Sequence, residues 1–219
     1  IPSDSSAIRL ATAALSLASL EHELGHQGEA VQRLEAAVRK LRESQQLAVG
    51  GALNVGLSFQ LGRLISQQGQ LAARYGRFDQ AGPQLREALA LLEAARGHQG
   101  LSAEERVEAD RLCVRAMATL ALQLGAVGKA AEGIVLAEQA KQSGLSAPAA
   151  SVEDAMTRIQ LHGNLALLLE STGATEESLS ELALAEQAAD LARYALAARA
   201  ALAAQEFNDV LVKPAWTDV

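Results

Sequence analysis

Apolar and small residues recur along the chain at fixed distances from four glycines, Gly25, Gly76, Gly128 and Gly173. One small residue lies seven positions before each glycine and another lies five positions after it, with apolar or small residues at nine and twelve positions after it. A glycine that follows a helix readily takes the left-handed conformation that ends the helix, so each predicts a turn between two helices. Four units with one layout indicate an internal repeat. The repeated positions are Ala18, Ala30, Leu34 and Ala37; Gly69, Ala81, Leu85 and Ala88; Ala121, Gly133, Ala137 and Ala140; and Ala166, Ser178, Leu182 and Ala185.

The small residues of each unit define how its two helices pack. They lie on either side of the turn, so two backbones can approach closely and form an antiparallel hairpin. The residues nine and twelve positions after the glycine continue an apolar stripe at helical spacing. Because one hairpin cannot bury its own stripe, successive hairpins stack. The sequence therefore predicts an all-α fold, an α-solenoid of about four antiparallel helix hairpins with a C-terminal capping helix.

Glycines, prolines and capping residues divide the chain into helical segments. Ser102 and Glu105 form a capping-box signature, and Ser151 with Asp154 gives a weaker version of the same cap. Residues 175–207 contain no glycine or proline, so they form one long helix or two with a break near Asp190. The predicted segments reach to residue 24 and then span about 29–47, 52–75, 79–95, 102–127, 130–142, 151–171 and 175–207.

This pattern divides the chain into an N-terminal tail (1–6), a helical repeat domain (7–207) and an extended C-terminal tail (208–219). The tail is expected to be extended because it contains β-branched residues and Pro214. Its last residues, 216–219, also fit a tail captured by a PDZ domain, with a terminal apolar side chain and a hydroxyl on Thr217. We keep that capture as an additional hypothesis.

Composition and charge exclude several classes of function. The chain of 219 residues carries a formal charge of −7 and has no basic run, which argues against binding to nucleic-acid phosphates. No stretch approaches the ~20 apolar residues of a membrane span, so no membrane insertion is expected. The single Cys113 rules out an intramolecular disulfide and reads as a buried small hydrophobe in a helix.

These features predict a soluble protein in a reducing compartment, the cytoplasm or the interior of an organelle. The chain begins with IPSDSS, without a methionine or a signal-peptide pattern. We expect either that a targeting segment was removed or that the chain is part of a longer protein.

The repeats resemble the tetratricopeptide family. The residues that carry the resemblance are Asn164, Leu165, Ala166, Leu169 and Gly173; Leu120, Ala121, Leu124 and Gly128; and Gly76, Phe78, Ala81, Leu85 and Ala88. The turn glycines are 51, 52 and 45 residues apart, longer than the family's usual period of about 34. The extra length indicates a long-helix variant. Core-face positions also carry the polar residues Glu21, Gln68 and His162.

The resemblance implies a concave groove that is lined by the first helix of each hairpin and binds peptides or partner helices. Arg63 and Arg115 take equivalent positions in it, thirteen residues before their turn glycines. Chaperone-binding members of the family hold a dicarboxylate tail with lysines, but this chain has no lysine at those positions. The expected partner-binding residues are Arg63, Ser66, Gln70, Arg74, Arg115, Leu122, Gln160, Leu167 and Glu170.

One motif suggests a different chemistry. His22-Glu23-Leu24-Gly25-His26 is a literal H-E-x-x-H, in which two histidines four apart on one helix bind Zn²⁺ and the glutamate acts as a base. Gly25 is the turn glycine of the first unit, however, so the second histidine should lie beyond the helix end. Glu29 and Gln32 occupy the places where the longer zinc signature has a glycine and a third histidine. We therefore assign no catalytic, cofactor-binding or metal-binding residue.

The sequence thus predicts a non-enzymatic scaffold or adaptor, without a cofactor, that holds a partner peptide, helix or domain in its groove. The alternative is a helical sensor domain that binds a small peptide or metabolite. A third reading, a zinc hydrolase that uses His22 and His26, differs from both in its metal content.

Overall fold

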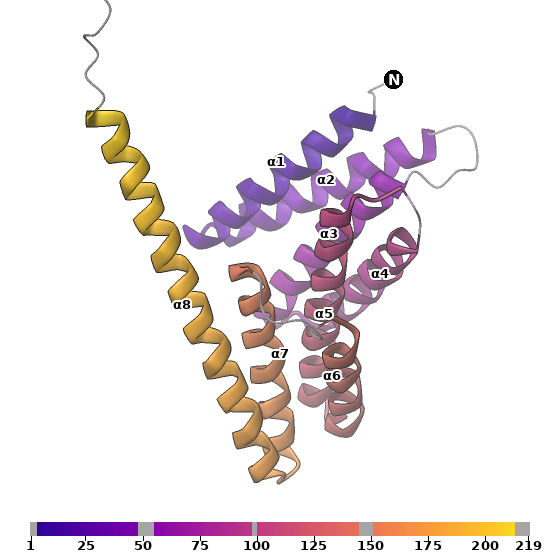
Figure 1. Cartoon of the computed structure of the whole chain (residues 1–219). Helices are drawn as coiled ribbons and strands as arrows, with labels where there is room; N and C mark the ends of the chain where they lie inside the picture. The colour runs from indigo at the N-terminus through magenta and orange to yellow at the C-terminus, as the bar shows by residue number, and fades with distance from the viewer. Residues whose placement is uncertain (1–3, 48–54, 98–99, 145–150, 213–219) are drawn as a thin grey trace, which may run out of the picture.

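Eight α-helices and no strand occur in the residues that the computed structural model describes, 4–47, 55–97, 100–144 and 151–212. They form four consecutive hairpins that stack along the molecule (Figure 1). The predicted all-α solenoid is therefore confirmed. The helices are α1 (Asp4–Glu23), α2 (Gln27–Leu47), α3 (Val55–Arg74), α4 (Phe78–Arg96), α5 (Ala103–Ala126), α6 (Ala130–Gly144), α7 (Val152–Ser171) and α8 (Thr175–Val212).

The four turn glycines have the predicted left-handed backbone. Their φ angles are 82° at Gly25, 71° at Gly76, 80° at Gly128 and 82° at Gly173, and no other described glycine has a positive φ. Each turn closes its helix with the same pair of backbone hydrogen bonds, a Schellman motif. In the first turn, for example, the amide after Gly25 donates to the Glu21 carbonyl at 2.8 Å.

Close packing across each turn explains the small residues. A Cβ added to Gly133 would lie 2.5 Å from the Ala121 carbonyl oxygen, so α5 and α6 meet backbone to backbone there. In the second hairpin the small residue before the turn is equally constrained, since a Cβ added to Gly69 would lie 2.6 Å from the Leu85 side chain. In the fourth hairpin the Ser178 hydroxyl donates to a carbonyl of α7 at 2.9 Å. The small residues therefore set the distance between helices.

The apolar stripe is buried in the first three hairpins but not in the last. Leu34, Leu85 and Ala137 are fully buried, whereas Leu182 at the same position in α8 is 48% exposed. No further described hairpin packs on α8, so its stripe remains uncovered (Figure 1).

Two boundaries differ from the expected domain limits. α1 already begins at Asp4, so residues 4–6 are helical rather than a tail. α8 continues without a break at Asp190 as far as Val212, so the expected extended conformation is wrong for residues 208–212. Pro214 and the proposed PDZ-binding residues 216–219 lie outside the described residues.

The predicted caps are present at α5 and α7. Ser102 and Glu105 exchange both hydrogen bonds of a capping box, at 3.1 and 2.8 Å. The Ser151 hydroxyl accepts from the amide of Asp154 at 3.1 Å. Both caps satisfy amides that have no partner within the helix.

Cys113 is buried among apolar side chains of α3, α4 and α5, as expected. Burial, together with the negative charge of Glu93, raises the pKa of its thiol to about 12. The thiol is therefore protonated and unreactive at neutral pH.

Two of the polar residues on the core face, Glu21 and His162, have charged partners. Glu21 forms an ion pair with Arg33 of α2. His162 of α7 contacts a carboxylate oxygen of Glu181 at 2.6 Å, and the other oxygen accepts from Lys141 at 2.7 Å. The contacts of Glu181 with His162 and Lys141 join α6, α7 and α8, because the three residues come from three different helices.

Candidate partner-binding groove

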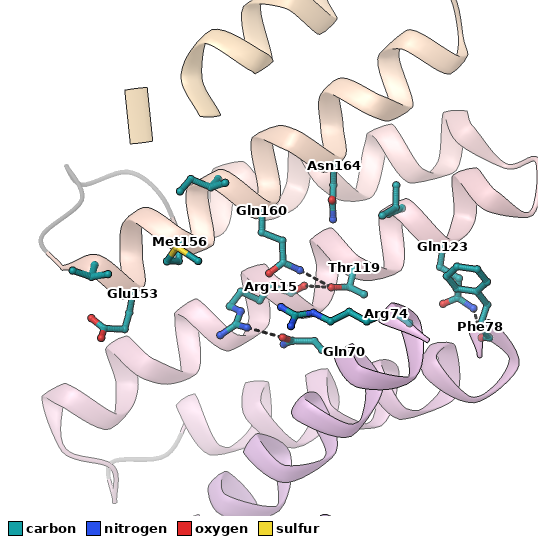
Figure 2. Close-up of a pocket in the computed structure, with 14 residues that line it drawn as sticks. Gln70, Arg74, Phe78, Arg115, Thr119, Gln123, Glu153, Met156, Gln160 and Asn164 are labelled. Atoms are coloured by element: carbon teal, nitrogen blue, oxygen red, sulfur yellow. Dashed lines mark hydrogen bonds between the residues drawn. The ribbon is translucent and has the colours of Figure 1, made fainter. Parts of the chain in front are cut away.

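The first helices of the second, third and fourth hairpins surround a cavity of about 580 Å³ (Figure 2). α3 and α5 form one wall and α7 the opposite one. Phe78, at the start of α4, lies at one end of the cavity. The lining residues are Gln70, Ala73, Arg74, Phe78, Arg115, Thr119, Leu122, Gln123, Val152, Glu153, Met156, Ile159, Gln160 and Asn164.

Amide side chains connect the three helices across the cavity floor. Gln70 of α3 accepts from the Arg115 guanidinium at 2.7 Å. Gln160 of α7 donates to the Thr119 hydroxyl of α5 at 2.8 Å, and Asn164 donates to a carbonyl of α5 at 2.9 Å. These bonds hold the polar side chains in fixed positions (Figure 2).

Two arginines face the cavity without a carboxylate partner. Arg115 is bonded to an amide, and Arg74 donates to Nε2 of His22 at 3.1 Å. Within the described residues, no Asp or Glu lies within ion-pair distance of either guanidinium. Burial lowers the pKa of Arg115, and the positive charges of Arg74 and Arg111 lower it further. The cavity is therefore locally positive in a chain whose net charge is −7.

Apolar side chains accompany the arginines. Val152, Met156 and Ile159 lie on the α7 wall, and Leu122 faces them from α5. Met156 is 57% exposed, so its side chain is accessible to a ligand. The cavity thus offers positive charge, amide groups and an apolar surface side by side.

The structure brings five of the nine expected groove residues to the cavity. They are Gln70, Arg74, Arg115, Leu122 and Gln160.

The other four do not line the cavity, and Arg63 lies in a different environment. Its guanidinium lies 2.8 Å from Glu108 of α5 and over the Phe59 ring. Ser66 is fully buried and accepts from Gln70, so it supports the wall from behind. Leu167 and Glu170 are exposed on α7 outside the lining.

Several lining residues were not predicted. Thr119 and Asn164 lie at one offset, nine residues before their turn glycines, on the same helical face as the predicted positions. Extending the predicted face by that offset would have identified both. Val152 and Met156 come from the first turns of α7, more than one helical turn before the predicted positions, and no sequence signal singled them out.

The H-E-x-x-H motif is split by the first turn. α1 ends at Glu23, so His22 and His26 do not share a helical face. His22 contacts the Tyr75 hydroxyl at 2.7 Å, whereas His26 lies 3.4 Å from Glu29. Across the described ranges, no three His, Cys, Asp or Glu side chains are grouped as metal ligands would be.

The comparison with known families concerns the first hairpin, outside the cavity. The family model for anaphase-promoting complex subunit 5 matches residues 2–61, which cover the first hairpin and the start of α3. The chain is therefore similar to that family over its first hairpin.

Solved structures and curated proteins add the following. A chain described as "MamA MSR-1 C2" is 15% identical over 82% of this chain and 97% of its own, with a TM-score of 0.37. A kinesin light chain with nearly identical TPR-like repeats from Podosopora anserina is 18% identical over 83% of this chain and 95% of its own, with a TM-score of 0.30. No curated protein matches the chain. None of the described helices is long and apolar enough to cross a membrane.

Proposed function

We propose that this protein is a non-enzymatic scaffold that holds an acidic peptide segment of a partner protein in the groove between α3, α5 and α7. The observation that carries the proposal is the pair Arg74 and Arg115, which faces the cavity without a carboxylate partner among the described residues. We further propose that residues 7–207 act as one domain, because every hairpin packs on the next.

A carboxylate suits the two arginines on electrostatic grounds. Arg115 is largely removed from water and is repelled by neighbouring positive charges, which lower its pKa. A carboxylate between the two guanidiniums removes that repulsion and accepts hydrogen bonds from their fixed donor forks. The positive cavity also attracts an acidic segment that the rest of the molecule, at −7, would repel.

The remaining lining suits a peptide. The amides of Gln123, Gln160 and Asn164 offer donors and acceptors of the kind that a peptide main chain needs. Met156 and Leu122 offer an apolar surface for a neighbouring side chain of the peptide. The expected ligand therefore carries an acidic residue close to an apolar one.

A binding experiment tests this function. Fluorescence anisotropy would measure the affinity of the protein for labelled ten-residue peptides that contain Glu and Leu. The same peptides with Gln in place of Glu serve for comparison. We expect the double variant Arg74→Glu with Arg115→Glu to lose binding to the acidic peptides, and Arg77→Glu, at an exposed arginine outside the cavity, to bind normally. Equal binding of acidic and neutral peptides, or normal binding by the double variant, would contradict the proposal.

The cavity volume favours one second candidate, a sensor for a small anionic metabolite. About 580 Å³ falls within the range of small-molecule pockets. The two candidates differ in ligand size. If the protein is a sensor, a free dicarboxylic acid should displace the peptide at concentrations near the dissociation constant of the acid. If it is a scaffold, tight binding should require the residues that flank the acidic residue in the peptide.

A further inference from the structure

A regular apolar stripe covers the outer face of α1. Leu10, Ala13, Leu17 and Leu20 follow one another at alternating steps of three and four residues, and Leu24 extends the series. This is the spacing of the a and d positions of a coiled coil. The four leucines are between 43% and 63% exposed, and Ala13 is also exposed.

The stripe has no role inside the described chain. α1 buries a different face, formed by Ala7, Ala11, Ala14 and Ala18. Among the described helices α1 touches only α2 and α3, at one end of the array (Figure 1). Two heptads of exposed leucine are costly to leave in water, because burial of apolar surface against a partner is favourable.

We propose that α1 pairs with α1 of a second copy of this chain, in antiparallel orientation, through this stripe. Antiparallel packing matches each a residue with a d residue of the other helix. Leu10 then faces the second copy's Leu20, and Ala13 faces the second copy's Leu17. Ala13 is the one small residue of the seam, and its packing against Leu17 lets the helices approach closely there.

Charged residues beside the stripe favour a second copy of this chain as the partner, and they favour the antiparallel orientation. Arg9 and Glu23 border the outer edge of the stripe, both are exposed, and neither has an ion-pair partner among the described residues. In the antiparallel register Arg9 of each copy lies opposite Glu23 of the other, so two ion pairs form. Ser16 lies opposite Ser16 of the second copy, near the two-fold axis. A two-fold interface requires such self-complementarity.

The inner edge of the stripe offers no free charge that could replace these ion pairs in a parallel dimer. Ala14 is buried there, and Glu21 is already paired with Arg33 of the same chain. In a parallel pair the outer edge of one helix faces this inner edge of the other, so Arg9 and Glu23 do not meet and neither ion pair forms. The stripe is also short, so the dimer should be weak, with a dissociation constant on the order of 10–100 μM.

A charge swap tests the pairing in the full chain. Sedimentation equilibrium from about 1 to 500 μM at low salt should show a monomer–dimer equilibrium. Arg9→Glu and Glu23→Arg should each weaken the dimer at least about fivefold, because like charges then face each other. The double variant, which exchanges the two charges, should return to within about twofold of wild type. A wild-type monomer at 500 μM, or a double variant that stays weak, overturns the proposal.

Further variants test whether the dimer contact lies on α1 or on another exposed surface. Leu17→Glu should abolish the dimer with an unchanged melting temperature, while Leu191→Glu, at an exposed leucine of α8, should leave it intact. Loss of the dimer in Leu191→Glu but not in Leu17→Glu would assign the contact to α8 and overturn the α1 seam. Ser16→Cys should be cross-linked between copies by a short bismaleimide, and Ala131→Cys on α6 should not.

Discussion

Nε of Arg63 lies 2.8 Å from Oε1 of Glu108, and this ion pair joins α3 to α5. Arg115 and Glu153 occupy the same two positions one hairpin later, thirteen and twenty residues before their turn glycines. They form no ion pair, because the Arg115 guanidinium is bonded to Gln70 instead. One arginine of the repeat is thus bound within the fold, and the other remains available in the cavity.

Glu153 is therefore expected to compete with an acidic ligand for Arg115. Glu153→Gln removes a negative charge from the cavity lining. We expect the affinity for an acidic peptide to rise by about twofold to fivefold, consistent with a partly exposed charge interaction of under ~1 kcal/mol. Anisotropy titrations at low and high salt measure the effect.

Glu186→Gln serves as the control for this change, since Glu186 is exposed on α8 away from the cavity. It removes the same charge from the whole protein and should leave the affinity unchanged. An equal gain in both variants would mean that net charge, rather than the cavity, governs binding.

Gly133 should tolerate no side chain. In an ordinary helix Gly→Ala stabilises by up to about 1 kcal/mol, but here the added Cβ meets the Ala121 carbonyl oxygen at 2.5 Å. Gly133→Ala should therefore destabilise the protein by roughly 1–3 kcal/mol. Gly163→Ala on α7, where nothing lies within 4 Å, should raise the melting temperature. Thermal unfolding that shifts both variants in the same direction would contradict backbone contact between α5 and α6.

The prediction for acid stability concerns Glu181. Burial alone would raise the pKa of this carboxyl, but hydrogen bonds from Lys141 and His162 outweigh it, so the pKa is lowered. A carboxyl with a lowered folded-state pKa stabilises the protein above its unfolded pKa of about 4.5, and that contribution is lost as the pH falls through the folded value.

Glu181→Gln should accordingly lower the melting temperature at pH 7, by an amount corresponding to roughly 1.5–3 kcal/mol. The difference from wild type should shrink as the pH falls below about 4.5. Glu138→Gln is the matched control, since Glu138 contacts the same lysine at 3.5 Å but is more exposed. Melting curves from pH 3 to 7 decide whether the difference disappears in acid.

The sequence specified the turns better than the groove. Gly128 and Ala121 were predictable because backbone conformation and close approach restrict those positions to glycine or alanine. Arg63 was not, since its direction depends on Glu108, a residue of the next hairpin that no local pattern connects with it. Leu182 shows the same dependence, because its burial requires a hairpin that would pack on α8. Backbone conformation and close helix packing within one hairpin therefore make the repeat predictable from the sequence. Contacts between hairpins decide which residues face the cavity.

Substitution of the two histidines near the first turn, His22 and His26, should change the stability of the protein by different amounts. Arg74 donates to Nε2 of His22, which leaves the Nδ1 hydrogen to bond the Tyr75 hydroxyl at 2.7 Å. This imidazole thus joins the end of α1 to the end of α3. His22→Ala should cost roughly 1 kcal/mol for the lost bonds, and His26→Ala should change stability by less than about 0.5 kcal/mol, since its contact with Glu29 is exposed.

Metal analysis completes this comparison. A zinc site built from both histidines would require them on one helical face, whereas α1 ends at Glu23 and Gly25 turns the chain between them. Protein purified without chelator should therefore contain far less than one zinc per chain, and neither variant should alter that content. One zinc per chain that is lost in His26→Ala would show that the turn rearranges to bind metal. The His22 bonds to Arg74 and Tyr75 would then describe only the metal-free form.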